Sequence, residues 1–453
     1  MSATAPRRVA LEVIRAVRES DAYANLLLPT RIVKAQLSSA DAALATELTY
    51  GTLRMQGYYD AVIAIAARRA VDQIDPPVLD VLRLAVHQIL GMRTAAHAAV
   101  SESVELVKTV GSRSAVGFAN GVLRTITRSD AETCRSRVAA TATTGEQRLA
   151  LEHSHPQWVV RALRQVLVAE GRESELEAAL IADNEAPRVS VTALPGLADR
   201  SEVEGRATAF SPVGAVLAGG DPQSHPAVRA GRVRVQDEGS QLAALALSRA
   251  RPVVAGEQWL DMCAGPGGKT ALLAAEAALG GATVTANELV PARAGLVRNA
   301  VAVFDTPPEV WELDGTEIGE RYPAAFDRIL LDAPCTGLGA LRRRPEARWR
   351  KQPSDVGELG GLQVRLLRSA LAALKPGGVL AYVTCSPHAA ETKSIVGTVL
   401  RKTPDAERLN TGAVLESIVG TPLDLAEGTH AQLWPHRHGT DAMFIQLITR
   451  HAS

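Results

Sequence analysis

Residues 258–270 read Gln-Trp-Leu-Asp-Met-Cys-Ala-Gly-Pro-Gly-Gly-Lys-Thr, a short apolar run followed at once by a glycine-rich turn. The run 258–262 has the length and composition of a buried strand, and residues 270–279 have the length and spacing of a helix. Gly265, Gly267 and Gly268 allow the backbone to turn tightly and to approach a ligand. Unpaired N–H groups at the start of the helix add hydrogen-bond donors at the same place. The stretch therefore predicts a strand, a ligand-binding loop and a helix, in that order.

Strand and helix signals continue in alternation after this stretch. Apolar runs stand at 283–288, 310–313, 328–331 and 379–384, and segments of helical length at 291–303 and 359–374. Such alternation predicts a mostly parallel sheet covered by helices on both faces, a Rossmann-like α/β domain that we assign to residues 251–453. Ligands of such sheets bind beyond the carboxyl ends of the strands. Two more strand-like runs, 430–434 and 442–448, close the chain.

The chain before residue 251 predicts two further domains, so the protein is multidomain, as its 453 residues allow. Apolar residues recur at helical spacing from Pro6 to about residue 128, and we expect an all-helical domain over residues 1–135. Ser39 with Asp41, and Asp75 before two prolines, are expected helix starts. Residues 145–250 begin with helical patterns and then turn to strand-like runs at 188–194 and 232–236, which predicts a small α+β module.

Charge and cysteine content limit the class of protein. Lys plus Arg equals Asp plus Glu at 49 each, which excludes a globally basic nucleic-acid-binding protein, so any RNA surface must be local. The four cysteines form no CxxC pair and have no matching His cluster, so we expect reduced thiols and no metal site. The N-terminus lacks an apolar leader, and no run of about 18 apolar residues occurs. We therefore expect a cytoplasmic protein without a membrane segment.

Polar residues follow the second and third predicted strands. Glu288 ends the second strand about 20 residues after the glycine-rich loop, where a carboxylate of a Rossmann-like fold accepts hydrogen bonds from ribose hydroxyls. Asp314 follows the third strand and would face the nucleoside or merely cap a helix. A solvated surface glutamate is the plain alternative for Glu288. Together with the loop, these residues favour a nucleoside cofactor.

Two cysteines follow the fourth and fifth predicted strands. Cys335 stands in DAPCTG, residues 332–337, and Cys385 stands in TCSP, residues 384–387. A single cysteine is usually a small buried apolar residue. Two cysteines at the carboxyl ends of adjacent strands, beside the glycine-rich loop, instead favour a reactive pair.

The motifs DMCAGPGGKT, DAPCTG and TCSP, with the strand that ends in Glu288, resemble the RNA 5-methylcytosine methyltransferases of the Sun/NOL family. VALEVIRAV, LTYGTLRMQGYYD, LRLAVHQIL, AAHAAVSESVELVK and FANGVLR are similar to the NusB-type RNA-binding domain of the bacterial 16S rRNA members, and VQDEGSQLAA is similar to their linker. The chain departs from the family pattern in three places. VSVTAL replaces an LRVN-like strand, Gly265 replaces a usual alanine, and LWPHRHGTDAMFIQL follows the terminal motif only loosely.

The resemblance implies methyl transfer from S-adenosylmethionine to C5 of a cytosine in RNA, with 16S rRNA as the expected substrate. C5 is too poor a nucleophile to take a methyl group unaided, but a thiolate added to C6 makes it enamine-like. The resemblance makes Cys385 this nucleophile and Cys335 the assistant in elimination, while Asp332 is placed to hydrogen-bond the N3/N4 edge of the base. The implied S-adenosylmethionine contacts are Cys263, Ala264, Gly265, Pro266, Gly267, Gly268, Lys269, Glu288, Asp314 and Asp332.

A basic segment follows Cys335 and suggests an RNA surface. Clustered arginines attract phosphates, and an aromatic ring can stack on an unpaired base, although a solvated basic loop is the alternative. The target cytosine should be single-stranded or flipped out. The candidate RNA contacts are Arg342, Arg343, Arg344, Arg348, Trp349 and Arg350, with a weaker patch at Arg7, Arg8 and Arg15. We expect RNA as the partner of a monomeric chain.

Two alternative functions remain open. The same catalytic motifs would serve a tRNA cytosine-C5 methyltransferase. A non-catalytic RNA-binding transcription or ribosome-assembly factor would instead keep an inactive Rossmann-like domain. The intact loop and both cysteines argue against the second alternative, and the NusB-like helices favour rRNA over tRNA by analogy.

Overall fold

The computed structural model describes residues 4–20, 22–92 and 94–451 and separates them into two units. The helical unit comprises the chain up to Arg164, Ser174–Glu185 and Leu341–Lys351. The sheet unit comprises Gln165–Glu173, Ala186–Ala340 and the chain from Gln352 onward. These units cut across the three segments expected from sequence, 1–135, 145–250 and 251–453, which remain a prediction. The main difference is Leu341–Lys351, which is far along the chain but packs within the helical unit.

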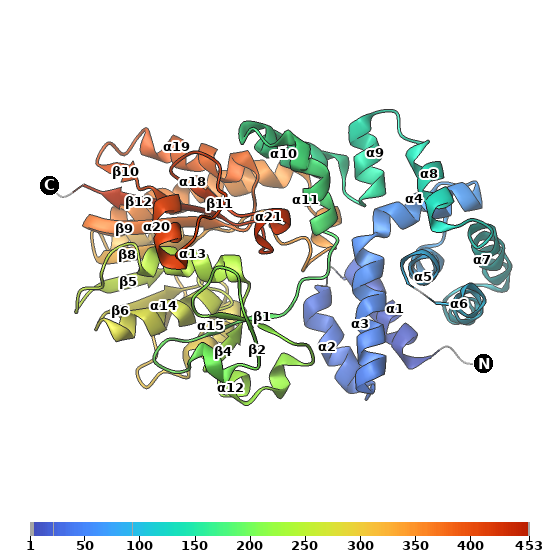
Figure 1. Ribbon diagram of the computed structural model, residues 1–453, viewed down its shortest axis with the longest axis horizontal. Coiled ribbons are helices and arrows are strands. Elements are labelled where there is room, and N and C mark those ends of the chain that lie inside the picture. Colours follow the sequence, from blue (N-terminus) through green and yellow to red (C-terminus); the bar gives the residue numbers. More distant parts are fainter. Residues whose placement is uncertain (1–3, 21, 93, 452–453) are drawn as a thin grey trace. The chain divides into compact units, whose positions relative to one another are not determined.

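The helical unit is built from amphipathic helices, as the periodicity predicts. In α1, the apolar residues at helical spacing, Val9, Val13 and Val17, are all buried in one core with residues of the later helices. α3 starts at Ser39, as expected, and Ser38 is its N-cap, because the Ser38 hydroxyl accepts the N–H of Asp41 at 3.2 Å. The helices of this unit labelled in Figure 1 are α1 (Ala5–Glu19), α2 (Ala24–Lys34), α3 (Ser39–Arg54), α4 (Gln56–Ala67), α5 (Pro76–Val86), α6 (Ala96–Val110), α7 (Arg113–Ile126), α8 (Ala131–Ala139), α9 (Gly145–Glu152) and α11 (Leu176–Ala182). The short helix α17 (Ala347–Arg350) also belongs to the unit, and the unit boundary passes through α10 (Gln157–Ala169).

A small antiparallel sheet opens the sheet unit. Its order is β2-β3-β1-β4, and its strands are β1 (Ser190–Ala193), β2 (Gly205–Ala207), β3 (Gly214–Leu217) and β4 (Val233–Val235), with α12 (Pro226–Arg229) beside them. The sequence predicted β1 and β4. It missed β2 and β3, since both are short and one, β2, is exposed along its length, which leaves no alternating pattern.

The main sheet has the order β10-β12-β9-β8-β5-β6-β7, with β11 paired to β12. Strands β9, β8, β5, β6 and β7 are parallel neighbours, and β12 joins β9 in the antiparallel sense. The strands are β5 (Gln258–Asp261), β6 (Thr283–Asn287), β7 (Glu309–Trp311), β8 (Phe326–Asp332), β9 (Leu374–Thr384), β10 (Ala406–Arg408), β11 (Ala431–Gln432) and β12 (Phe444–Arg450). The parallel order places the carboxyl ends of β5, β6, β8 and β9 at one edge of the sheet.

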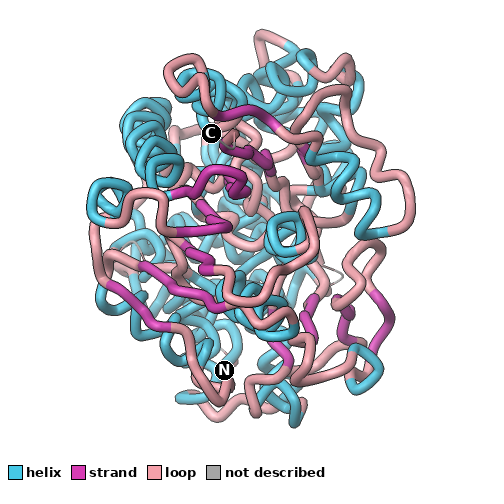
Figure 2. Tube along the Cα trace, turned by 90° about the vertical axis from the view of Figure 1, so that its left-hand side faces the viewer, coloured by secondary structure: helices cyan, strands magenta, loops and turns pink. Residues whose placement is uncertain are grey.

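Helices cover both faces of this sheet, with strands in magenta and helices in cyan in Figure 2. Side chains alternate between the faces: Trp259 and Leu330 pack on one side, and Leu260 and Ile329 pack on the other. The first face buries α13 (Glu238–Ser248), α14 (Gly268–Leu279) and α20 (Thr411–Val419), and the second buries α16 (Ile318–Arg321), α18 (Pro353–Ala373) and α19 (Lys393–Leu400). α15 (Pro291–Val301) packs near β6 and β7, and α21 (Pro435–His438) precedes β12. The predicted α/β fold is confirmed.

Candidate active site

The glycine-rich loop between β5 and α14 is held by packing against its neighbours. Gly267 has a φ of 101°, and a Cβ there would lie 2.5 Å from the Cβ of Ala300 in α15. A Cβ at Gly265 would lie 2.4 Å from Oε2 of Glu288. The N–H of Gly265 donates to that oxygen at 3.1 Å, so the loop backbone rests on the Glu288 carboxylate. Only glycine permits this approach at both positions.

Carboxylates gather around this loop. Asp261 is fully buried and accepts the Thr270 hydroxyl at 2.7 Å, and burial raises its pKa to about 7. Glu288 is 5% exposed and accepts the N–H of Val290 at 3.1 Å through its second oxygen. Asp314 accepts the N–H and the hydroxyl of Thr316, each at 2.8 Å, so it caps the turn after β7, as the cap alternative supposed. Buried carboxylates beside backbone donors suit a nucleoside cofactor that carries a positive charge.

The two cysteines that the sequence singled out lie together. The sulfur atoms of Cys335 and Cys385 are 3.5 Å apart. Cys335 lies just beyond β8 and Cys385 just beyond β9, and these parallel neighbours are in register from Arg328 opposite Val379 to Asp332 opposite Val383. Both thiols are half-buried, and neither takes part in a disulfide. The fold therefore forms a thiol pair at the same edge as the glycine-rich loop.

The electrostatic surroundings of this pair keep the proton on Cys335. The pKa of Cys335 is raised well above its usual value, first by its hydrogen bond to Cys385 and then by burial, so Cys335 stays a thiol. Nζ of Lys269 lies 2.8 Å from Oδ2 of Asp332. Burial acts against the charge of Lys269, but Asp332 and Cys385 outweigh it, and the pKa of Lys269 is raised. A lysine that remains a cation beside Cys385 favours a thiolate there.

Comparisons with known proteins identify the family of this chain. Residues 251–449 match the family model of the 16S rRNA methyltransferase RsmB/F, and residues 4–128 match that of the NusB family. The chain is 47% identical to the putative methyltransferase Rv1407 of Mycobacterium tuberculosis, covering 98% of this chain and 96% of that one. It is 31% identical to the probable ribosomal RNA small subunit methyltransferase B of Bacillus subtilis, with 98% of each covered. The chain belongs to the RsmB/F family of 16S rRNA methyltransferases.

Membership of the RsmB/F family makes the chain an S-adenosylmethionine-dependent methyltransferase that acts on rRNA. The crystal structure of PH0851 has the same fold, with a TM-score of 0.80, 22% identity and 98% of both chains covered. The resemblance to a NusB-type domain joined to a Rossmann-like methyltransferase domain is confirmed. S-adenosylmethionine fits the donor set of the loop, since Glu288 suits the ribose hydroxyls and the nearby carboxylates suit the positive sulfonium.

The other residues of the glycine-rich loop that we predicted to contact S-adenosylmethionine differ in exposure and in hydrogen-bond partners. Pro266 is exposed, whereas Ala264 is buried and its N–H donates to Asn287 at 2.9 Å. Burial comes first among the causes that raise the pKa of Cys263, so this third thiol stays neutral. Lys269 contacts Asp332 and lies on the thiol side of the loop. We therefore connect Lys269 with the cysteine pair as well as with the cofactor.

The basic segment Leu341–Lys351 packs within the helical unit. Arg348 is fully buried and donates to the backbone oxygens of Ser154 at 2.9 Å and Asp183 at 3.2 Å and to Oδ1 of Asn184 at 2.8 Å. The ring of Trp349 packs on Gly57, where a Cβ would lie 2.4 Å from Cη2. Arg348 therefore serves internal packing and has no surface for the phosphate contact that we expected. Trp349 is half-buried, and its expected contact with a base stays a prediction.

The other arginines of the segment vary in exposure. Arg342 is buried and Arg343 is half-buried. Arg350 donates to the backbone oxygens of Val17 at 2.8 Å and Ala22 at 2.6 Å. Arg344 is exposed, with its guanidinium 5.6 Å from the ring centroid of Tyr23. Arg344 keeps the surface that a phosphate contact needs.

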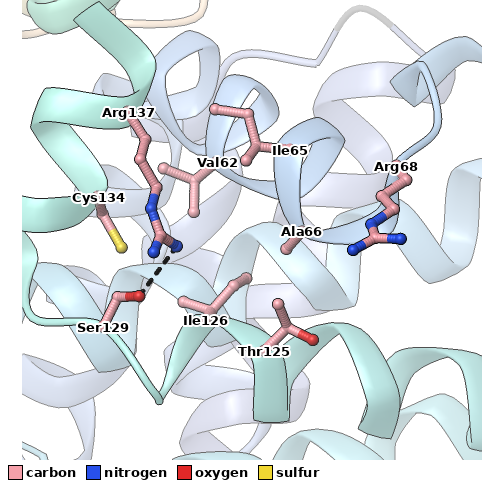
Figure 3. A pocket seen from close by; sticks show the side chains of 9 residues that line it. All are labelled: Val62, Ile65, Ala66, Arg68, Thr125, Ile126, Ser129, Cys134 and Arg137. Carbon is pink, nitrogen blue, oxygen red and sulfur yellow. Dashed lines mark hydrogen bonds between the residues drawn. The ribbon is translucent and has the colours of Figure 1, made fainter. Parts of the chain in front are cut away.

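Two features of the helical unit were not foreseen. A cavity of about 310 Å³ lies among α4, α7 and α8, lined by apolar side chains with Arg68 and Arg137, and Arg137 donates to the Ser129 hydroxyl at 3.1 Å (Figure 3). Glu152, His153 and Glu177 each hold one potential metal-ligand atom within 4.8 Å of the others. Neither feature includes a residue that the sequence predicted to be functional. No helix among residues 4–20, 22–92 and 94–451 is long and apolar enough to cross a membrane.

Sequence reasoning missed two buried polar residues that contact the cysteine loops. Glu391 lies in the turn η7 (Ala389–Glu391) after β9, and Gln363 lies in α18. Both side chains are 0% exposed. No pattern in the sequence marked Glu391, because HAAETK mixes alanines with polar residues at no regular spacing. Gln363 stands alone in an ordinary helical pattern. A polar residue on the apolar face of α18 was the one available signal.

Proposed function

We propose that this rRNA methyltransferase modifies C5 of a cytosine in 16S rRNA through a covalent bond between Cys385 and C6 of the base. The observation that supports it is the 3.5 Å separation of the Cys335 and Cys385 sulfur atoms at the carboxyl ends of β8 and β9. Transfer of methyl to an exocyclic nitrogen needs no nucleophilic thiol. Transfer to C5 requires one, because the ring carbon must first be activated.

The proposed reaction has three steps on the base. The Cys385 thiolate forms a bond to C6, and the electron pair released into the ring makes C5 nucleophilic. C5 then takes the methyl group, which S-adenosylmethionine supplies as an electrophile when bound. Finally a base removes the C5 proton, and the bond between sulfur and C6 breaks, returning its electron pair to Cys385.

Cys335 is the residue that we assign to the last step. Its pKa is held high mainly by its hydrogen bond to Cys385, with burial as the second cause. Once Cys385 is bonded to carbon, that sulfur no longer carries a negative charge, so the pKa of Cys335 falls. Cys335 then loses its proton more easily and can accept the C5 proton beside the departing sulfur.

Lys269 and Asp332 support the charges of the reaction. Lys269 favours the Cys385 thiolate before addition. Asp332 binds Lys269 through Oδ2, and its side chain keeps 26% of its surface exposed at the site edge. A carboxyl group there is placed to hydrogen-bond the N3/N4 edge of cytosine, which stabilises charge that develops in the ring.

We extend the proposal to partner and location. Arg344 is the arginine of the basic segment that we retain as an RNA contact. Both thiols, Lys269 and Asp332 come from one chain, so we propose that the monomer is catalytically complete. Because ribosomal RNA is the substrate, we infer that the protein acts in the cytoplasm. The thiol chemistry itself requires no metal ion.

The test is tritium transfer from labelled S-adenosylmethionine to purified 16S rRNA and to tRNA, with the product analysed as nucleosides. Labelled 5-methylcytidine in 16S rRNA supports the proposal, and bisulfite sequencing of RNA from a strain lacking the protein then locates the base. Label on tRNA alone, or on a base other than cytosine, contradicts it. RNA binding with no transfer to either RNA would favour a non-catalytic factor.

A further inference from the structure

One fully buried carboxylate joins the two loops that hold the cysteines. Oε1 of Glu391 accepts the N–H of Thr336 at 2.8 Å. Oε2 accepts the Thr336 hydroxyl at 2.5 Å and the Ser386 hydroxyl at 2.6 Å. Thr336 follows Cys335 directly, and Ser386 follows Cys385 directly. A single side chain thus binds the residue next to each thiol.

Neighbouring polar groups complete this connection. Nε2 of Gln363 donates to the backbone oxygen of Pro334 at 2.8 Å, on the other side of Cys335, and lies 3.4 Å from Oε1 of Glu391. The Tyr382 hydroxyl donates to the backbone oxygen of Glu391 at 2.8 Å. The loop after β8, the loop after β9 and helix α18 therefore meet at Glu391.

Burying a carboxylate is costly, so its presence here needs a reason. The partners above are a backbone N–H, two hydroxyls and an amide, all of them neutral donors that fix the carboxylate in place. Stability alone would be served as well by an apolar side chain of the same volume, since replacing a buried charge and its partners together is often neutral. What an apolar side chain cannot do is hold two loops at a set distance by directional bonds.

We propose that Glu391 is a positioning residue for the thiol pair: its hydrogen bonds to Thr336 and Ser386 set the separation and orientation of Cys335 and Cys385. The expected effect of Glu391 on turnover rests on the proposed function. Its effect on the placement of the two sulfur atoms rests only on the hydrogen bonds. The hydrogen bonds described for the Glu391 side chain go to Thr336, Ser386 and Gln363 and not to the glycine-rich loop, so we expect S-adenosylmethionine binding to be independent of it. The negative charge of Glu391 also raises the pKa of Cys335, after the larger effects of Cys385 and burial, which helps to keep the charge on Cys385.

The first measurement needs no methyl transfer. Diamide oxidises two neighbouring thiols, which each lose one hydrogen atom to the reagent as the disulfide forms. We follow the rate at which the Cys335–Cys385 disulfide forms in the native full-length protein by peptide mass spectrometry. This rate reports how well the two sulfur atoms are placed for reaction with each other. We expect Glu391→Gln, which keeps the volume, and Thr336→Val, which removes one hydroxyl, to slow this rate on the order of tenfold.

The second measurement is turnover on 16S rRNA. We expect Glu391→Gln to lower kcat on the order of 100-fold, the effect of misplacing a reacting group by about 1 Å. The KM for S-adenosylmethionine should stay within about twofold. This split separates positioning from general damage to the fold, which would raise KM as well.

Glu257→Gln is the matched control. Glu257 is also a buried carboxylate of the sheet unit, and it binds the Trp259 indole at 2.8 Å and Arg328 at 2.9 Å, but it lies just before β5, at the amino edge of the sheet. Its variant should keep the disulfide rate and kcat. The inference is overturned if Glu391→Gln keeps both values, or if Glu257→Gln loses both equally. If wild type transfers no methyl group but its disulfide rate depends on Glu391, the proposed function fails while the positioning stands.

Discussion

Replacing Arg348 by alanine tests whether the basic segment is a packing element of the helical unit. The guanidinium is fully buried and donates four hydrogen bonds, to Ser154, Asn184 and Asp183 and, at 3.3 Å, to the backbone oxygen of Arg54. Burial lowers its pKa to about 10, which still leaves a cation at neutral pH. The alanine variant leaves four buried oxygens without this donor and opens a cavity, while it also removes the cost of burying the charge. The net loss of unfolding free energy should be about 3–5 kcal/mol.

Arg344→Ala is the control, because Arg344 belongs to the same segment but is exposed. Its variant should change the unfolding free energy by no more than about 0.5 kcal/mol. Urea denaturation gives the free energies, and hydrogen exchange locates the loss. Amides of α9 and α11 should exchange about a hundredfold faster in Arg348→Ala and at the wild-type rate in Arg344→Ala. RNA affinity at matched salt should fall in Arg344→Ala. A packing role for Arg348 is contradicted if Arg348→Ala keeps its stability and its slow exchange but loses RNA affinity.

Three further predictions concern the active site. Cys385→Ala should abolish methyl transfer, and Cys335→Ala should leave a covalent protein–RNA adduct on a denaturing gel; an adduct trapped by the loss of Cys385 instead would reverse the roles. Lys269→Gln should slow alkylation of Cys385 by iodoacetamide at pH 7 about tenfold, because the thiolate loses a neighbouring cation; an unchanged rate would exclude that role. Asp261 has a folded pKa of about 7, above its unfolded value of 3.8, so the folded state binds the extra proton between these pH values and stability falls as pH rises through this window. The loss should be on the order of 4 kcal/mol between pH 4 and pH 8, and Asp261→Asn should remove it; equal pH profiles for both proteins would show that Asp261 does not titrate in this range.

Local patterns predicted the catalytic half of the molecule well, because its elements are long and regular. The strands that end before Cys335 and Cys385 each contain an apolar run, Ile329–Leu331 and Val379–Val383, and a parallel sheet aligns their carboxyl ends. The edge strand β10 was missed, since two of its three residues are exposed. Asp314 shows the limit of a strand-end argument. Its position after β7 fits a cofactor contact equally well, but its hydrogen-bond partner in the structure is Thr316.

Arginine content was a poorer guide than strand pattern. Charged runs are usually solvated, so the segment after Cys335 predicts a basic surface. Arg348 and Arg350 instead donate to backbone oxygens of residues more than 150 positions away in sequence. No local pattern predicts such partners. The backbone oxygens at a helix end or in a turn lack a local donor, and the arginine that donates to them comes close only in the tertiary structure.

Sequence patterns were sufficient to predict the α/β fold, the helical domain, the glycine-rich loop and the two cysteines to which we assign the chemistry. Each of these depends on interactions between residues close in the chain, on side-chain periodicity or on the chemistry of one residue type. Only the tertiary structure decided that the sulfur atoms of Cys335 and Cys385 lie 3.5 Å apart, that Glu391 joins their loops, and that Arg348 is buried in the helical unit. Those facts depend on hydrogen bonds and packing between segments that are distant in the sequence. Local sequence patterns do not predict which of these segments contact one another.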